Sequence, residues 1–353
     1  MTTTLERIIG DCRNNNGGDC VGARDCRGVH SSKGARRQRR RQLKSCLGGL
    51  AVVLVFVLAF LSVPVANADP QGAHITDVEH ISDRWDKVSV YSPSMNNVVV
   101  NDVFKAPGSG APTFYLLPGI DGGGWFAMTD IQGFFANKNV NVVSPLGGPF
   151  SWYTDWVNDG SKQYQTYMTQ ELPPVINAQY HTNGKNAVGG LSSTGGTAID
   201  YAVQAPGVYR AVGSYSGFPS VSDPDEAQDV ALTLSGGGAS AEAMWGPLGG
   251  PLWVAHDPAK NAAKLKGVAV YAAASSGAVG DVDRLPADFG PNIVGGFIED
   301  KIADSTKRFA DAAAAAGVPI HYVVRPEGSH TWGLFESEMQ ESWNTTVGPA
   351  LGA

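Results

Sequence analysis

From about residue 69 onward, short apolar runs alternate with longer stretches in which apolar residues recur at helical spacing. The first pattern predicts β-strands and the second predicts amphipathic helices. Their regular alternation predicts βαβ units around a mostly parallel central sheet flanked by helices, the α/β class. Strands are expected at residues 98–103, 113–117, 140–144, 186–191, 211–215, 268–272 and 320–324, and helices at 131–137, 163–179, 194–204, 259–265, 299–316 and 335–346.

The connections between these predicted elements hold most of the 44 glycines and 21 prolines. Several glycines follow the C-terminal ends of strands, the edge at which α/β sheets build their sites. The connection 218–251 is long and glycine-rich, and we expect it to cap the site, since loops of that length are usually functional. No internal repeat or linker interrupts residues 69–353, which we therefore interpret as one domain.

The first 68 residues have a different character. The basic run 36–44 leads into an apolar stretch at about 47–65, followed by Ala66-Asn67-Ala68. This order of basic, apolar and small residues is typical of a secretory signal peptide, so we expect cleavage after Ala68 and export to the cell envelope. An uncleaved membrane anchor is the alternative, because the apolar stretch is long enough to span a bilayer.

Charge divides the chain at the same place. The net charge of −7 combines 11 basic and four acidic residues before position 51 with 15 basic and 29 acidic residues from Asp69 onward. An acidic domain argues against a nucleic-acid partner, because phosphate recognition requires clustered basic residues. All four cysteines lie in the basic head, and their spacings match no zinc-binding pattern, so we expect no cysteine metal site.

Ser192 is the strongest candidate for a catalytic residue. It lies in the segment Gly189-Gly190-Leu191-Ser192-Ser193-Thr194-Gly195, directly after a predicted strand. Small residues around a serine permit the sharp strand-to-helix turn of a nucleophile elbow. Thr194 departs from this pattern, which has glycine two residues after the nucleophile. The following helix would direct its N-terminal dipole at a developing oxyanion.

A serine nucleophile needs a general base, and the position of His330 is suitable. Of the six histidines after residue 69, this one lies between the last predicted strand and the last helix. In the chain order serine, acid, histidine of α/β-hydrolases, the base belongs there. The acid must lie between Ser192 and His330, where Asp281, Asp283 and Glu299 compete. Spacing alone does not choose among them.

Phrases along the whole domain resemble those of the antigen 85 type mycolyltransferases, a branch of the α/β-hydrolase esterases. Two further segments, residues 136–143 and 209–213, are most similar to the corynebacterial and nocardial members. The phrases that match the family as a whole are VYSPSM (90–95), YLLPGI (115–120), SWYTDW (151–156), TQELPP (169–174), GLS (190–192), MWGP (244–247), HDP (256–258) and GSHTW (328–332).

The resemblance implies roles for individual residues. It implies that Glu299, in the phrase Phe297-Ile298-Glu299, is the acid of a Ser192–His330–Glu299 triad. It also implies that the backbone N–H groups of Ile120 and Ser193 form the oxyanion hole. Substrate contacts are expected from Asp121, Trp125 and Trp332, and residues 150–156 are expected to support an acyl groove. Pro118 and Asp121 replace an acid and an arginine of the mycobacterial members, so the trehalose contacts that those two residues make in the mycobacterial members do not transfer to this chain.

The expected function is therefore a secreted acyltransferase. It would move a mycoloyl group from trehalose monomycolate to a sugar hydroxyl of trehalose monomycolate or arabinogalactan, as a monomer at the envelope surface. This reaction would need no metal or organic cofactor. The first alternative is a secreted carboxylesterase with the same triad and water as acceptor. The second is an adhesion or scaffold protein that keeps the fold without catalysis.

Overall fold

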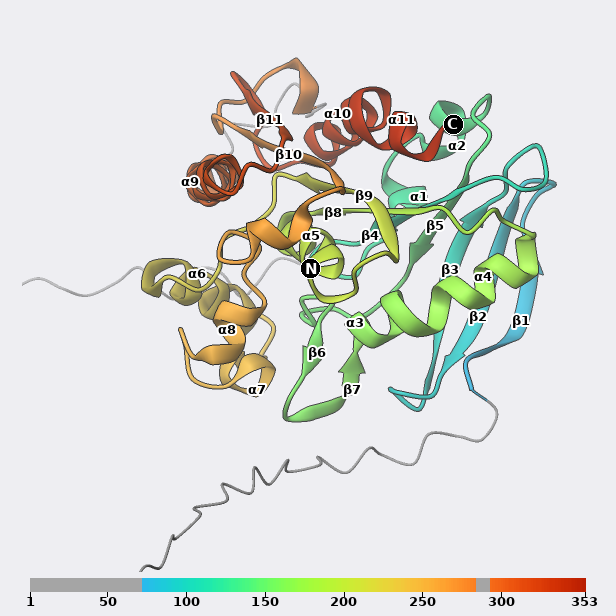
Figure 1. Ribbon diagram of the computed structural model, residues 1–353, viewed down its shortest axis with the longest axis horizontal. Coiled ribbons are helices and arrows are strands. Elements are labelled where there is room, and N and C mark those ends of the chain that lie inside the picture. Colours follow the sequence, from blue (N-terminus) through green and yellow to red (C-terminus); the bar gives the residue numbers. More distant parts are fainter. Residues whose placement is uncertain (1–71, 284–292) are drawn as a thin grey trace, which may run out of the picture. The chain divides into compact units, whose positions relative to one another are not determined.

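The computed structural model describes residues 72–283 and 293–353, which contain a central sheet covered by helices on both faces (Figure 1). The predicted signal peptide and its cleavage site lie outside the described residues. No helix within the described ranges is long and apolar enough to cross a membrane.

Nine strands form the main sheet, in the order β1-β2-β3-β5-β4-β8-β9-β10-β11. From β5 to β11 neighbouring strands are parallel, whereas β1, β2, β3 and β5 pair antiparallel. The strands are β1 (His74–His80), β2 (Trp85–Ser92), β3 (Asn97–Phe104), β4 (Thr113–Leu117), β5 (Asn141–Pro145), β8 (Asn186–Leu191), β9 (Tyr209–Tyr215), β10 (Ala269–Ser275) and β11 (Ile320–Arg325); β6 (Asp155–Trp156) and β7 (Asp159–Gln163) form a separate hairpin.

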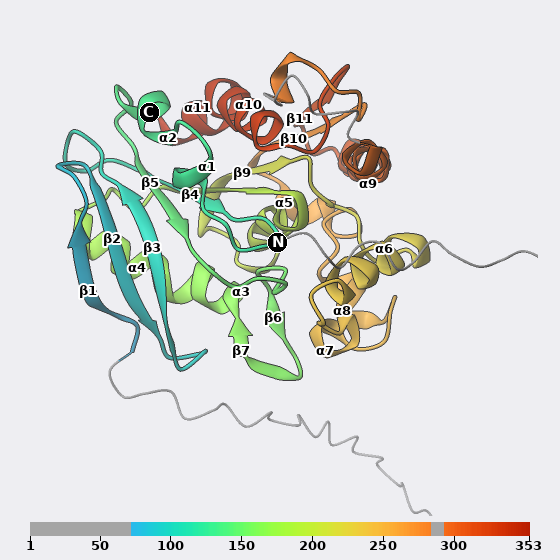
Figure 2. The same ribbon diagram turned by 180° about the vertical axis from the view of Figure 1, so that it is seen from behind.

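Side chains of the parallel strands alternate between two apolar layers. Tyr115 and Leu117 of β4 point into one buried cluster, and Phe114 and Leu116 point into the other. The first layer holds residues of α4 (Leu172–Tyr180), α5 (Gly195–Gln204) and α9 (Ile293–Ala315). The second holds residues of α1 (Trp125–Met128), α2 (Ile131–Phe135), α10 (Trp332–Ser342) and α11 (Gly348–Leu351). Because successive side chains point to opposite faces, each face of the sheet is apolar and is covered by helices (Figure 2).

The predicted connection 218–251 is helical rather than irregular. It contains α6 (Pro224–Ser235) and α7 (Ala241–Trp245), and α8 (Pro251–Ala255) begins at its end. These helices share a third apolar cluster with Trp152 and Trp156, and Ile120 packs against that cluster. Proline at the first position of α6 and α8 suits a helix start, where its missing N–H is not needed.

Most sequence-predicted elements are present with shifted ends. The predicted helix 163–179 is divided into α3 (Tyr164–Thr166), a π-helical turn η1 (Tyr167–Glu171) and α4. The predicted helix 259–265 is only a 3₁₀ turn, η3 (Ala262–Leu265). The predicted helix 299–316 begins earlier, at Ile293, and 335–346 is α10 followed by the π-helical turn η5 (Trp343–Val347). Two short 3₁₀ turns, η2 (Ser192–Thr194) and η4 (Asp281–Asp283), lie at the site.

The strand order reverses at β4, whose neighbours are β5 on one side and β8 on the other. At such a switch point the loops after adjacent parallel strands diverge and leave a crevice at their carboxyl ends. The segments after β4, β8, β9 and β11 therefore meet at one edge of the sheet.

Candidate active site

Ser192 follows β8 immediately and has φ of +52°, the left-handed conformation that a tight strand-to-helix turn requires. Neighbouring glycines make room for this turn. A Cβ at Gly190 would lie 2.2 Å from the carbonyl oxygen of Thr194, and one at Gly196 would lie 2.0 Å from that of Phe218. Backbone atoms cannot move aside as a flexible side chain can, so these positions need glycine.

Thr194, which departs from the usual elbow pattern, links the elbow to the loop after β4. Its hydroxyl lies 2.8 Å from the carbonyl oxygen of Pro118 and 3.0 Å from that of Leu191. The N–H of Leu191 donates to the same hydroxyl at 3.2 Å. The threonine thus fixes the loop that carries Ile120 relative to Ser192.

Three side chains from distant parts of the chain form one line of hydrogen bonds. Ser192 Oγ lies 2.9 Å from His330 Nε2, and His330 Nδ1 lies 2.6 Å from Glu299 Oε1. Because an ionised carboxylate can only accept, the ring proton belongs on Nδ1, which leaves Nε2 free to accept from the serine. Glu299 is fully buried, whereas the His330 side chain keeps 14% of its surface exposed.

Glu299 is held by a dense set of donors. Its Oε2 lies 3.0 Å from the hydroxyl of Ser216 and accepts from the N–H of Ser275 at 3.1 Å. The Ser275 hydroxyl lies 2.9 Å from the same oxygen and 2.8 Å from the carbonyl oxygen of Gly328. Ser216 follows β9 and Ser275 ends β10, so both lie at the carboxyl ends of the parallel strands. Among Asp281, Asp283 and Glu299, the structure brings only Glu299 into contact with the His330 ring.

Asp283 holds the loop of His330 rather than the imidazole itself, a role that the sequence did not indicate. It is buried, and its Oδ1 accepts from the N–H of Ser329 and the hydroxyl of Thr331, both at 2.8 Å. These two residues flank His330, which has φ of +54°. Asp283 therefore clamps the loop that presents the histidine. The spacing of two acids in η4 contained no signal that distinguished Asp283 from exposed Asp281.

Removing this clamp should affect both stability and turnover. In Asp283→Ala, two donors beside His330 lose their acceptor, and we expect a loss of about 2–4 kcal/mol in the free energy of unfolding. We also expect kcat to fall about ten- to a hundredfold, because the imidazole is no longer held in one position. Urea unfolding and ester hydrolysis measure the two effects. Asp281→Asn is the matched control, and equal behaviour of the two variants would contradict the clamp.

The residues expected to bind substrate differ in exposure. Asp121 is exposed, and its Oδ1 accepts from the N–H of Gly123 at 3.0 Å. Trp332 is half-buried and contacts Trp125 edge to face, with ring centroids 5.5 Å apart. Trp125 is fully buried and donates its indole N–H to the carbonyl of Leu117 at 2.8 Å. A direct substrate contact from Trp125 therefore does not fit this structure; it supports Trp332 from behind.

The segment 150–156 and Ile120 lie together. The N–H of Phe150 donates to the carbonyl of Ile120 at 2.8 Å, and both residues pack against the apolar cluster of α6–α8. Phe150, Trp152 and Tyr153 all have positive φ, between +50° and +57°. Ser193, the second expected oxyanion donor, is the residue after Ser192 at the start of η2.

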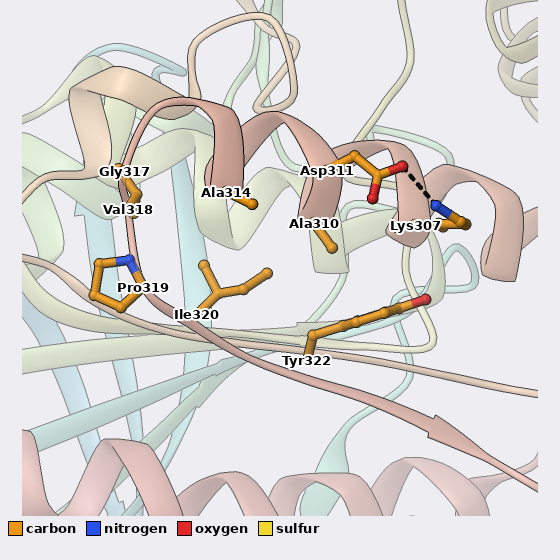
Figure 3. Close-up of a pocket in the computed structure, with 9 residues that line it drawn as sticks. All are labelled: Lys307, Ala310, Asp311, Ala314, Gly317, Val318, Pro319, Ile320 and Tyr322. Carbon is orange, nitrogen blue, oxygen red and sulfur yellow. Dashed lines mark hydrogen bonds and ion pairs between the residues drawn. The ribbon is translucent and has the colours of Figure 1, made fainter.

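A separate groove of about 610 Å³ lies between the C-terminal end of α9 and the start of β11 (Figure 3). Ala314, Ile320 and Tyr322 line it, and Lys307 pairs with Asp311 at its rim. None of the predicted site residues contributes to this groove. It lies at the edge of the sheet opposite to Ser192, because β11 begins there.

The Esterase family model matches residues 86–345, a span that includes Ser192, Glu299 and His330. The chain belongs to this family. It is 29% identical to the diacylglycerol acyltransferase/mycolyltransferase Ag85A of Mycobacterium tuberculosis (strain ATCC 25618 / H37Rv), over 75% of this chain and 81% of that protein. It is 31% identical to Ag85A of Mycobacterium gordonae, over 71% and 77%.

Among solved structures, Mycobacterium tuberculosis MPT51 (FbpC1) matches with a TM-score of 0.65 at 24% identity, over 77% of this chain and 99% of that one. An S-formylglutathione hydrolase from Agrobacterium tumefaciens matches with a TM-score of 0.56 at 14% identity, over 77% and 97%. These likenesses confirm the α/β-hydrolase fold. The resemblance to antigen 85 type proteins is confirmed, and the chain is an enzyme of the esterase type with acyltransferase relatives.

Proposed function

We propose that this esterase-family enzyme transfers a mycoloyl group from trehalose monomycolate to a sugar hydroxyl through an acyl-enzyme on Ser192. The observation that carries the proposal is the hydrogen-bond line Ser192–His330–Glu299, with distances of 2.9 and 2.6 Å. The similarity to Ag85 proteins, which are named mycolyltransferases, supports the acyl group and the reaction class.

In the first half-reaction His330 Nε2 takes the proton of Ser192 Oγ as the oxygen attacks the donor ester. The N–H groups of Ile120 and Ser193 would stabilise the resulting oxyanion. Collapse of this intermediate breaks the bond to the trehalose oxygen, which takes the proton from Nε2. Glu299 stabilises the imidazolium that exists between these two proton transfers.

In the second half-reaction the acceptor hydroxyl gives its proton to His330 and attacks the acyl-serine. The new ester forms, and Ser192 recovers its proton. Transfer requires the acceptor sugar to react faster than water, which a binding site achieves by raising its effective concentration. Exposed Asp121 and half-buried Trp332 are the side chains we assign to that sugar site. Neither half-reaction requires a cofactor.

Carboxylester hydrolysis with the same residues is the second candidate, favoured by the family match. Incubation with trehalose monomycolate separates the two. Transfer yields trehalose dimycolate and free trehalose, whereas hydrolysis yields free mycolic acid and trehalose. Free mycolic acid as the sole lipid product would exclude the transferase. The Ser192→Ala variant is the control for both reactions, because it should form neither trehalose dimycolate nor free mycolic acid.

An envelope scaffold without catalysis is tested by a serine-reactive phosphonate. We expect Ser192 to be labelled in the folded protein, because the adjacent imidazole activates its hydroxyl. Absence of labelling in protein shown to be folded would favour the scaffold. We further propose that the segment 1–68 exports the enzyme to the cell envelope. The arabinogalactan or trehalose monomycolate acceptor would be encountered there.

A further inference from the structure

A second glutamate lies behind the Ser192–His330–Glu299 line. Glu338 of α10 is fully buried, and its Oε1 lies 3.2 Å from the hydroxyl oxygen of Ser216. The same hydroxyl lies 3.0 Å from Glu299 Oε2. Ser216 thus bridges two carboxyl groups, one of which holds the histidine.

A hydroxyl has a single proton, so Ser216 can donate to only one of these carboxyl groups. If both were ionised, the other contact would bring two acceptor oxygens together without a proton between them. Both contacts are hydrogen bonds only if one carboxyl carries a proton and donates to Ser216 Oγ. The bridge therefore requires one neutral acid.

The surroundings decide which acid is neutral. Glu299 has a donor at each oxygen, the imidazole at Oε1 and the N–H of Ser275 at Oε2. Glu338 Oε2 has no hydrogen-bond partner among the described residues. A buried carboxylate with an unpaired oxygen is costly, whereas a protonated acid is much less so. The proton therefore belongs to Glu338.

The charged and titratable groups around Glu338 agree with this assignment. The carboxylates of Glu299 of α9 and Glu341 of α10 both raise the pKa of Glu338. Tyr215 of β9 and Tyr271 of β10 are the other titratable side chains near it, and burial raises the pKa of both phenols. Arg325 of β11 has its Nε 4.0 Å from Glu338 Oε1, but its hydrogen-bonded partner is Glu341. Burial first, and then the Glu299 carboxylate, raise the pKa of Glu338 well above its usual range.

We infer that Glu338 is a protonated positioning residue. It donates to Ser216 and thereby commits the Ser216 hydroxyl to Glu299, which orients His330. The chain of donors runs Glu338 to Ser216 to Glu299, and no step of catalysis moves a proton along it. The role in catalysis rests on the proposed function, whereas the protonation state of Glu338 does not.

The proton on Glu338 can be detected without substrate, from the pH dependence of unfolding. In the unfolded chain Glu338 loses its proton near pH 4.5, whereas the folded protein keeps it to higher pH. Folding stability that depends on this group is present at low pH and is lost as pH rises toward the folded pKa. The group therefore raises the unfolding equilibrium constant about tenfold per pH unit in that window.

The experiment is urea unfolding of the protein and of Glu338→Gln between about pH 5.5 and 7.5. The glutamine can donate to Ser216 but cannot titrate. We therefore expect the slope of the logarithm of the unfolding constant against pH to be lower by about one in Glu338→Gln than in the wild type. Glu242→Gln, at an exposed acid of α7, should leave the slope unchanged. Identical slopes for Glu338→Gln and the wild type would overturn the neutral assignment.

The positioning role has its own readout in ester hydrolysis. Glu338→Gln should keep kcat within about threefold, whereas Glu338→Leu should lower kcat about tenfold with KM unchanged. The effect of leucine should vanish in a Ser216→Ala background, because the link to Glu299 is then already absent. Equal losses in the Gln and Leu variants, or an undiminished leucine effect without Ser216, would overturn this role. A correct proton count with failed mycoloyl transfer would refute the proposed function alone.

Discussion

Replacement of Ser192 by alanine is expected to lower kcat for acyl transfer about a millionfold, the size of effect seen when a triad nucleophile is lost. Without the hydroxyl no acyl-enzyme forms, and His330 has no proton to accept. The fold should remain, because alanine keeps the Cβ that the elbow already accommodates at φ of +52°. Mass spectrometry of the acyl-enzyme and single-turnover kinetics with a chromogenic ester measure the loss.

The matched control is Ser193→Ala, in which the neighbouring side chain is removed and the backbone N–H is kept. Because the proposed oxyanion donor is that N–H, we expect Ser193→Ala to retain most of the activity. If Ser192→Ala lost folded protein in proportion to activity, Ser192 would be a structural residue. If it kept activity, the nucleophile would have to be sought elsewhere in the chain.

Glu299→Gln is expected to lower kcat about ten-thousandfold with little change in KM. The amide can still accept from one neighbour, but it cannot stabilise the imidazolium, and its NH₂ group favours the tautomer with the proton on Nε2. That tautomer cannot accept the proton of Ser192. The expected signature is loss in the chemical step, seen as equal falls in kcat and kcat/KM.

Asp281→Asn is the control for this variant, since Asp281 was an equal candidate from spacing and lies exposed in η4. We expect it to be nearly silent. The exchange of these two outcomes would refute Glu299 as the acid. A fall in folded protein for Glu299→Gln alone would be less informative than kinetics, so circular dichroism should accompany both measurements.

The parallel strands from β5 to β10 were predictable because they are buried on both faces and are mostly apolar. The edge strand β11 was predictable from its β-branched and aromatic residues alone, since none of its side chains is fully buried. The strands 113–117 and 186–191 agree residue for residue with the structure. The edge strand β1 and its neighbour β2 were missed for the converse reason. In β2 only alternate positions are buried, and β1 has none that is fully buried, so neither is a continuous apolar run. Short α6–α8 were missed because glycines separate them.

The pairing of Ser192 with His330 was predictable from chain order, because each residue follows the carboxyl end of a parallel strand. Glu299 was not, since it lies on α9, whose position over the sheet depends on tertiary packing. The parts played by Asp283, Thr194 and Ser216 were equally hidden. Each forms a hydrogen bond with a residue 46 to 83 positions away in the sequence. Such pairings exist only in the folded chain.

The bond between Thr194 and Pro118 makes the nucleophile elbow and the oxyanion loop one mechanical unit. A loop exchange that imports residues 118–121 from a relative would therefore carry only half of a module. The recipient elbow would meet a carbonyl in a new position, and its threonine would lose a partner it needs. Acceptor specificity in this protein should thus be re-engineered by moving both segments together, or by substitutions at Asp121 that leave the shared carbonyl in place.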